Sequence, residues 1–437
     1  MELIKTEQQL LDDLVKAQEK GDAQAEINAY IRLGNHYLGA GDTPKGMTQF
    51  DEAIKVAKKS KDKIAEAKLE GLYGICLKQV GNYESASQAF RRSLRLAKKI
   101  EDKVLEGDAL YQIGALMVDQ GEGIGALSHL DNALIIAIEN RDNQRKLATA
   151  NLMGNIFLSL ESVDKAVESY ATALETAKEI GSKEAEAASR VHLGQAFMLD
   201  ESYDAAVENF EYALTIADQI SAVQIELQAL NGLMNACAGE GKTSLAVIYG
   251  EQLINKAHGI GAQAQEVQSI YTLATILFSN EQYEKAIPYL ERGLEIVHKN
   301  QDPDWELNFL AELGIAQYLI ENLEEAKATM QQALEIAVRF QMKAEEAVIT
   351  GRLASIHADM GELEESNELA QRAIALAEEY ELRMLKGEQL VVLAMNYNDL
   401  GDNSQAKETI QQAIELYRAE EQEEMLGQAE AVLESFL

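Results

Sequence analysis

The sequence contains little of what several protein classes require. Two cysteines in 437 residues provide no disulfide framework, and three prolines with no Ser/Gly-rich stretch indicate no flexible or proline-rich linker. No apolar run approaches the roughly 20 residues that cross a membrane. The opening MELIKTEQQLLDDL lacks a basic segment followed by an apolar core, so we expect no secretion signal and a cytoplasmic location.

Positive charge is also scarce. The 39 lysines and arginines face 73 aspartates and glutamates, which gives a formal net charge of −34, so we expect neither nucleic-acid binding nor membrane insertion. The imbalance is uneven, because residues 1–100 hold 17 cations and 14 anions, a net of +3, and the rest of the chain carries −37. One end of the protein is mildly basic and the remainder is strongly acidic.

An internal repeat of forty residues organises the chain. The column of Gly34 contains glycine or another small residue in every copy except one, where Met234 stands, and the column of Gly46 is almost entirely alanine. The column of Phe50 holds mostly large apolar residues. The predicted copies are 21–60, 61–100, 101–140, 141–180, 181–220, 221–260, 261–300, 301–340, 341–380 and 381–420. A single unit of this size cannot bury its apolar face alone, so neighbouring copies must stack.

Each copy predicts two amphipathic helices. In the first copy, apolar residues follow the helical period, Gly41 and Asp42 interrupt it, and the period then resumes. Pro44 falls in the first turn of the second helix, where a missing N–H costs little. Small residues let helices approach to about 8 Å while large ones fill the adjacent gaps. Residues 1–20 and 421–437 are expected to form capping helices.

The small and large residues Tyr30, Leu33, Gly34, Phe50 and Ala53 resemble the signature of the tetratricopeptide repeat family. The forty-residue unit is similar to the long-repeat branch found in Pins-type and rapsyn adaptors, kinesin light chain and MalT-like sensor domains. The resemblance implies an all-α fold, a right-handed superhelical solenoid of ten stacked helix-turn-helix repeats with capping helices. It also implies a concave groove lined by the first helix of each repeat.

One short stretch suggests a different chemistry. The sequence ACAGEGKTS, residues 236–244, fits a relaxed phosphate-loop pattern. A working phosphate loop follows a buried strand, whereas the preceding residues have the helical period of a first helix. Gly241 falls in the same column as Gly41, so we interpret it as a turn residue and expect Thr243 to cap the second helix, as Thr43 would.

No other constellation points to catalysis or to a cofactor. The six histidines lie in different repeats and show no metal-ligand spacing. Cys76 and Cys237 belong to the second and sixth copies, too far apart to bridge in a stacked array. No nucleophile with a base and an orienting acid is apparent. We therefore predict a protein that is not an enzyme and binds no metal or other cofactor.

The resemblance places partner contacts on one stripe of the first helices, in the columns of residues 31 and 35. Amides are concentrated there in the central copies, and a side-chain amide can donate and accept at once, which suits an extended peptide backbone. Two tyrosines flank them. The predicted groove residues are Asn35, Tyr111, Asn151, Asn155, Gln195, Asn231, Asn235 and Tyr271. The alternative is that these are ordinary solvated positions.

The partner is expected to be a protein or peptide with an extended or basic segment. In the column of residue 28 only Lys68 is basic, which argues against the carboxylate clamp that some family members use for chaperone tails. The acidic remainder of the chain favours a partner that carries lysine or arginine.

A second surface is suggested by the basic end. Last-turn cations in the first two copies recur at the forty-residue spacing and would form a ridge, which comprises Lys55, Lys58, Lys59, Arg95, Lys98 and Lys99. Such a ridge could dock an acidic partner, or the acidic end of another copy head to tail. Cations in the last turn of a helix are also an ordinary response to the helix dipole.

Two functions remain open at this point. The first is a non-enzymatic scaffold or adaptor that binds a partner polypeptide segment in its groove. The alternative is a sensor or regulatory subunit that binds a small peptide or metabolite and controls a separate effector chain.

Overall fold

Helices joined by turns of two or three residues make up the whole of the described structure. A computed structural model describes residues 6–436, and every regular element in that range is an α-helix. The helices are α1 (Glu7–Lys20), α2 (Ala23–Gly39), α3 (Thr43–Ser60), α4 (Lys63–Gln79), α5 (Tyr83–Lys99), α6 (Lys103–Asp119), α7 (Gly123–Glu139), α8 (Asn143–Ser159), α9 (Val163–Glu179), α10 (Lys183–Leu199), α11 (Tyr203–Ile220), α12 (Val223–Gly239), α13 (Thr243–Gly259), α14 (Gln263–Ser279), α15 (Tyr283–Asn300), α16 (Pro303–Leu319), α17 (Leu323–Arg339), α18 (Lys343–Asp359), α19 (Leu363–Glu379), α20 (Arg383–Asp399), α21 (Asn403–Ala419) and α22 (Glu423–Ser435).

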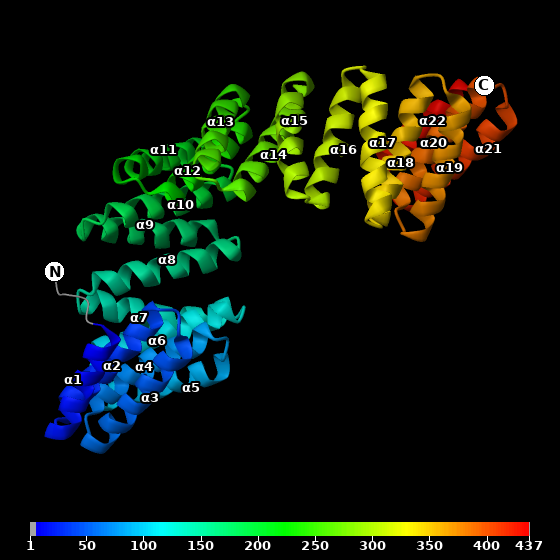
Figure 1. Ribbon diagram of the computed structural model, residues 1–437. Helices are drawn as coiled ribbons and strands as arrows, with labels where there is room; N and C mark the ends of the chain where they lie inside the picture. The colour runs from blue at the N-terminus through cyan, green and yellow to red at the C-terminus, as the bar shows by residue number, and fades with distance from the viewer. Residues whose placement is uncertain (1–5, 437) are drawn as a thin grey trace. The chain divides into compact units, whose positions relative to one another are not determined.

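The helices repeat every forty residues and pack as neighbours in chain order. First helices such as α2, α4 and α6 begin at Ala23, Lys63 and Lys103, and each packs against the second helix that follows it (Figure 1). First helices of successive pairs also touch, as α4 touches α6 and α18 touches α20. The expected all-α array of stacked helix pairs is confirmed. We propose to divide residues 21–420 into ten repeats flanked by α1 and α22. Residues 1–5 of the predicted N-terminal cap and residue 437 of the predicted C-terminal cap lie outside the described range.

A left-handed residue ends nearly every helix and fixes the turn. Gly41 has φ of 79°, its N–H donates to the carbonyl of Leu38, and Asp42 accepts from the N–H of Lys45 at the start of α3. Glycine adopts this conformation without strain, whereas other residues resist it. Glutamate nevertheless occupies the same column at Glu161, where φ is 54°. The turn geometry is therefore kept even where the sequence does not favour it.

The glycine column has a direct packing cause. A Cβ added to Gly34 would lie 2.7 Å from Cε1 of Phe50, whose ring is fully buried in the second helix of the same pair. In the pair α12–α13 the two sizes are exchanged: Met234 stands in the glycine column, and a Cβ on Gly250 would lie 3.0 Å from its Sδ. One large and one small residue thus fill this contact together, in either order.

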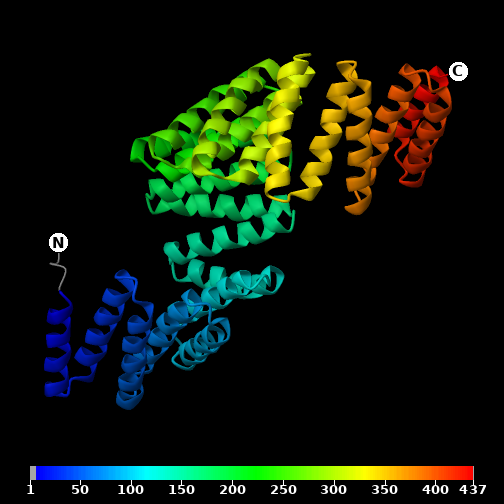
Figure 2. The same cartoon turned by 45° about the vertical axis from the view of Figure 1, so that its right-hand side comes forward.

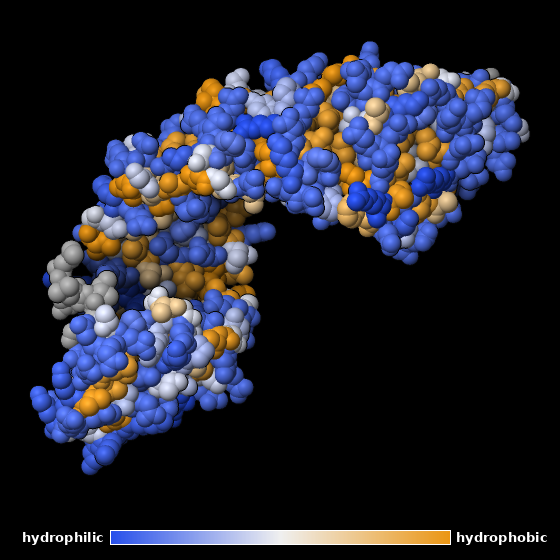
Figure 3. Space-filling model, viewed as in Figure 1, coloured by the Kyte–Doolittle hydropathy of each residue, from blue (hydrophilic) through white to orange (hydrophobic). Residues whose placement is uncertain are grey.

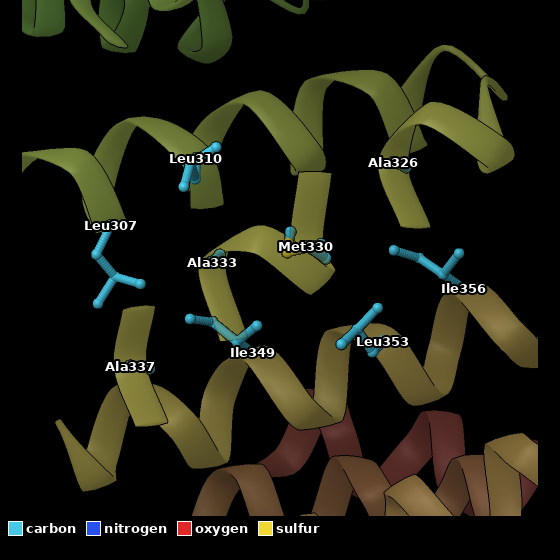
Figure 4. Packing of buried hydrophobic residues seen from close by; sticks show 9 residues of the cluster. All are labelled: Leu307, Leu310, Ala326, Met330, Ala333, Ala337, Ile349, Leu353 and Ile356. Carbon is cyan, nitrogen blue, oxygen red and sulfur yellow. The ribbon is translucent and has the colours of Figure 1, made fainter. Parts of the chain in front are cut away.

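The chain separates into two units, Met1–Gly232 and Leu233–Leu437, with the boundary inside α12. Within the second unit, α16, α17 and α18 lie side by side in both ribbon views (Figures 1 and 2). Figure 4 shows how their core is built, with Leu307 and Leu310 of α16 and Leu353 of α18 converging on the alanines and Met330 of α17. The small residues of α17 let both neighbours approach closely.

On the face shown in Figure 3 hydrophilic residues predominate, and hydrophobic residues appear in narrow patches between them. None of the helices within residues 6–436 combines the length and apolar character needed to span a membrane.

Candidate functional site

A cavity opens on the first-helix face of the first unit. It has a volume of about 340 Å³ and is lined chiefly by α4 and α6, with Lys68, Gly71, Ile75, Asp108 and Gln112 among its walls. Gly71 and Ile75 occupy the columns of residues 31 and 35, the stripe that the sequence assigned to partner contacts. Lys68, Asp108 and Gln112 lie beside this stripe, in the columns of residues 28 and 32. The expected groove face is therefore hollowed where copies two and three meet.

Asn155 is tied to the core by a tyrosine that replaces phenylalanine. The column of Phe50 contains Tyr170 in the fourth copy, and its Oη donates to Oδ1 of Asn155 at 2.6 Å. The Tyr170 ring is fully buried, and this burial raises its pKa to about 12. The side chain of Asn155 is exposed, so its carbonyl is held inward while its NH₂ group remains able to donate on the first-helix face.

Buried polar atoms without partners are concentrated on α8 and α10. Within the described residues, six side-chain atoms of these two helices are inaccessible and have no hydrogen-bond partner. They are Nε of Arg145, Oγ1 of Thr149, Oδ1 of Asn151, Oγ of Ser189, Nε of Arg190 and Nδ1 of His192. Burial also lowers the pKa of His192, so its imidazole is neutral near pH 7. A buried polar atom without a partner costs about 1–3 kcal/mol, so such a concentration is unusual.

Three of these residues lie two repeats, or 80 residues, after residues that line the cavity between α4 and α6. Asn151 corresponds to Gly71, Ser189 to Ala109 and His192 to Gln112. The aromatic rings of Tyr170 and His192 lie 5.1 Å apart between centroids. Amide, hydroxyl and imidazole groups thus replace the glycine, alanine and glutamine of the neighbouring junction.

Tyr111 does not offer the bare aromatic surface that the sequence suggests. The guanidinium of Arg145 lies 4.4 Å from its ring centroid, and the same arginine forms an ion pair with Asp108. Arg145 belongs to the following first helix, α8, and also lines the cavity. A cation stacked on a tyrosine is a stabilising arrangement, and here it covers the ring.

Tyr271 belongs to an aromatic cluster in the second unit. Its ring meets Trp305 and Phe309 edge to face, with centroids 5.3 and 5.6 Å apart. Its Oη donates to Oε1 of Glu312 at 3.4 Å, and burial raises the pKa of both groups. Sequence reasoning missed Trp305, the single tryptophan of the chain, because it lies outside the two columns considered.

The remaining predicted groove residues are divided between the units. Asn35 on α2 and Gln195 on α10 are exposed, and so is Asn231 on α12, all within the first unit. Asn235, four residues further along α12, is half-buried and belongs to the second unit. Of the amides predicted in the central copies, Asn151, Asn155, Gln195 and Asn231 therefore belong to the first unit, and Asn235 belongs to the second.

The basic ridge is partly neutralised by the protein itself. Lys55 lies 2.7 Å from both Asp51 and Glu52, and these hydrogen bonds raise its pKa. Lys58 reaches Glu70 at 3.4 Å, while Lys98 approaches Glu106 at 3.8 Å. A further set of ridge residues, Lys59, Arg95 and Lys99, has no ion pair within the described residues. A docking role for the ridge stays a prediction.

A glutamate column accounts for the pair of Lys98 with Glu106, and the sequence analysis missed this column. Eight copies carry glutamate at Glu26, Glu66, Glu106, Glu186, Glu226, Glu266, Glu306 and Glu346. For Glu106, Glu266 and Glu306 the last turn of the preceding second helix supplies a cationic or ionisable partner, as His298 does for Glu306 at 2.7 Å. In the tenth copy the charges are exchanged, and Lys386 contacts Glu378 at 2.7 Å. At these junctions a side chain in the last turn of a second helix therefore links successive repeats.

The phosphate-loop match is a helix turn. Gly241 has φ of 75° between α12 and α13, and Nζ of Lys242 lies 2.8 Å from Glu240. The expected cap is wrong, because Thr243 is the first residue of α13 and its hydroxyl donates to Asn280 at 2.8 Å. Thr43 is likewise the first residue of α3, which Asp42 caps. The residue before each threonine occupies the cap position.

The two cysteines and six histidines are distributed along the chain. Both Cys76 and Cys237 are buried, they lie in different units, and no disulfide joins them. Among residues 6–436, no three or more His, Cys, Asp or Glu side chains are grouped so as to hold a metal ion.

The repeat signature and the packing agree with a known family. Models of the tetratricopeptide repeat match residues 26–99, 266–337, 151–219 and 390–420, together more than half of the chain. The chain belongs to the tetratricopeptide repeat family. Proteins of this family typically bind other proteins. A comparison with curated protein sequences finds no match.

Solved structures show the same fold at low identity. The repeats resemble a signal transduction ATPase with a tetratricopeptide repeat sensor from Pyrococcus horikoshii, at 16% identity and a TM-score of 0.50. That match covers 94% of this chain and 55% of the other, so this chain spans about half the length of that protein. Aspartyl phosphate phosphatase F from Bacillus subtilis gives 15% identity, coverage of 80% and 93%, and a TM-score of 0.46. Kinesin light chain repeats from Podospora anserina are 20% identical to this chain, with a TM-score of 0.40. That match covers 45% of this chain and 97% of the other.

Proposed function

We propose that this tetratricopeptide repeat protein is a non-enzymatic scaffold that binds an extended segment of a partner polypeptide on its first-helix face. The binding face would run along α4, α6, α8 and α10 within the first unit. The carrying observation is the set of six buried polar atoms without partners on α8 and α10. A peptide backbone offers an N–H and a C=O at every residue, which can satisfy such groups once side chains rearrange to admit it.

Charge and shape support the same conclusion. The cavity of about 340 Å³ on α4 and α6 can receive a side chain of the bound segment, with apolar walls from Leu72 and Ile75. A net charge of −34 favours the approach of a segment that carries lysine or arginine. Salt should then slow association, because screening shortens the range of this attraction.

The test is capture of partners by three matched baits. Asn155→Ala combined with Gln195→Ala removes two exposed amides from the face, and its captured set should lose the partner held by the intact protein. Tyr170→Phe is the control, since it removes the hydrogen bond to Asn155 but keeps the amide, and phenylalanine occupies this column in other copies. Circular dichroism should show the same helicity for all baits.

The control separates binding from folding. Tyr170→Phe should retain the partner, because Asn155 stays on the face. Equal capture by the double alanine variant and the intact protein would refute the proposed face.

A second candidate is a sensor subunit for a small ligand. It is favoured by a separate cavity in the second unit, between α18 and α20, with a volume of about 420 Å³. The likeness to the Pyrococcus horikoshii protein concerns the fold alone, so it does not decide between the two functions. Both functions can coexist, since the two cavities lie in different units.

A further inference from the structure

The junction between α18 and α20 brings a cation, an anion and a buried amide together around one cavity. Its cavity of about 420 Å³ is lined by Arg352 and Ser355 of α18 and by Glu388 and Gln389 of α20, with apolar walls from Leu385 and Val392. At no other junction of the chain do the columns of Arg352 and Glu388 carry opposite charges. The volume falls in the roughly 300–1,000 Å³ range of small-molecule sites.

Gln389 is the buried polar group of this junction. It is only 3% exposed, yet its Oε1 accepts no hydrogen bond from any described residue. The same column holds alanine, leucine, serine or other short or apolar residues in most copies. Gly351 makes room for it, because a Cβ there would lie 2.8 Å from Nε2 of Gln389. The glycine and the glutamine thus form one arrangement that the fold alone does not require.

The two charged groups of the cavity form no ion pair with each other. Arg352 and Glu388 form no ion pair within 4.0 Å among residues 6–436, whereas Arg372, Arg383 and Lys386 on the neighbouring helices each pair with a glutamate. Arg352 acts electrostatically on Glu312 and on the Oη of Tyr318, and in both cases it opposes the rise in pKa that burial causes. A ligand that brings a carboxylate to Arg352 and a cation to Glu388 would complete both.

We propose that this cavity binds a free α-amino acid with an apolar side chain. Its carboxylate pairs with Arg352, and its ammonium donates to Glu388 and to Oε1 of Gln389. Its side chain packs on Val348, Leu385 and Val392. A protein terminus carries only one of the two charged groups, so the presence of both Arg352 and Glu388 favours the small zwitterion. This site lies in the second unit and goes beyond the polypeptide scaffold proposed for the first.

Calorimetric titration of the full chain with L-leucine, L-valine, L-methionine and L-phenylalanine tests the site. At least one should bind, and N-acetylation or amidation of that amino acid should each weaken binding at least tenfold. Absence of binding by all four at millimolar concentration would overturn the proposal, and so would equally tight binding of the N-acetylated form.

Three variants show that the cavity is responsible. Arg352→Ala and Gln389→Leu should each weaken binding at least tenfold, whereas Lys407→Ala, which removes an exposed cation on α21, should not change it. Gln389→Leu is decisive because it removes a buried oxygen without a partner, so the melting temperature should stay the same or rise while binding is lost. Unchanged affinity in Gln389→Leu would contradict the assignment.

Discussion

Gly74→Ala should destabilise the protein although alanine favours helices. Gly74 lies in α4, and an added Cβ would sit 2.5 Å from Cε1 of Phe90, a fully buried ring in α5. That contact is far inside normal packing, so α4 and α5 must move apart. Overpacking of this kind costs about 1–3 kcal/mol. The higher helix propensity of alanine stabilises the protein by at most about 1 kcal/mol relative to glycine. The net loss should be about 1–2 kcal/mol.

Two further variants isolate the cause. Gly71→Ala in the same helix meets only Oγ of Ser93 at 3.7 Å, so it should stabilise by about 0.5–1 kcal/mol. The double variant Gly74→Ala/Phe90→Leu copies the Ala274 and Leu290 pair of the seventh copy and should recover part of the loss. The assay is denaturant unfolding followed by circular dichroism, with hydrogen exchange across α4 and α5 to locate the effect. A Gly74→Ala protein as stable as Gly71→Ala would refute the packing explanation.

Three other predictions follow from local geometry and charge. Glu161→Gly should raise the free energy of unfolding by about 0.5–1 kcal/mol, because φ there is 54°, and an unchanged unfolding midpoint would contradict this. Burial opposes ionisation of Glu346, but hydrogen bonds from Lys343 and Arg372 outweigh it and lower its pKa, so the stability it contributes at neutral pH should be lost as acid protonates it. Glu346→Gln should flatten the fall of the melting temperature below the ordinary glutamate pKa. ATP should leave the melting temperature unchanged in the intact protein and in Lys242→Ala alike, and a shift that only the intact protein shows would revive the phosphate loop.

The sequence predicted the fold because each local signal agreed with the global one. The forty-residue spacing located every helix pair, and Gly41 and Gly241 marked turns that the structure confirms. The exchange of Met234 and Gly250 was visible as two unrelated departures in separate columns. Only the structure shows that the two side chains meet and compensate each other.

The candidate site was less predictable, because contacts between side chains of different repeats decide it. Arg145 covers Tyr111 across thirty-four residues, and nothing in a column pattern indicates that orientation. The hydroxyl of Tyr170 reaches Asn155 because phenylalanine was replaced at one place in an otherwise apolar column. The glutamate column could have been found from its spacing, but glutamate is usually exposed, so its burial at Glu346 was not expected.

The most direct test of the scaffold is photo-crosslinking from defined positions. A photoreactive amino acid replaces Gln195, which is exposed on the first-helix face, while Asn155 is kept to hold the partner. In a second protein it replaces Glu208, which is exposed on the second helix α11 of the same repeat. Each protein is irradiated with the captured partner, and the crosslinked peptide is identified by mass spectrometry. We predict crosslinks from position 195 to an extended, lysine- or arginine-containing segment, and none from position 208. Crosslinking from position 208 alone would contradict the assignment of the binding face.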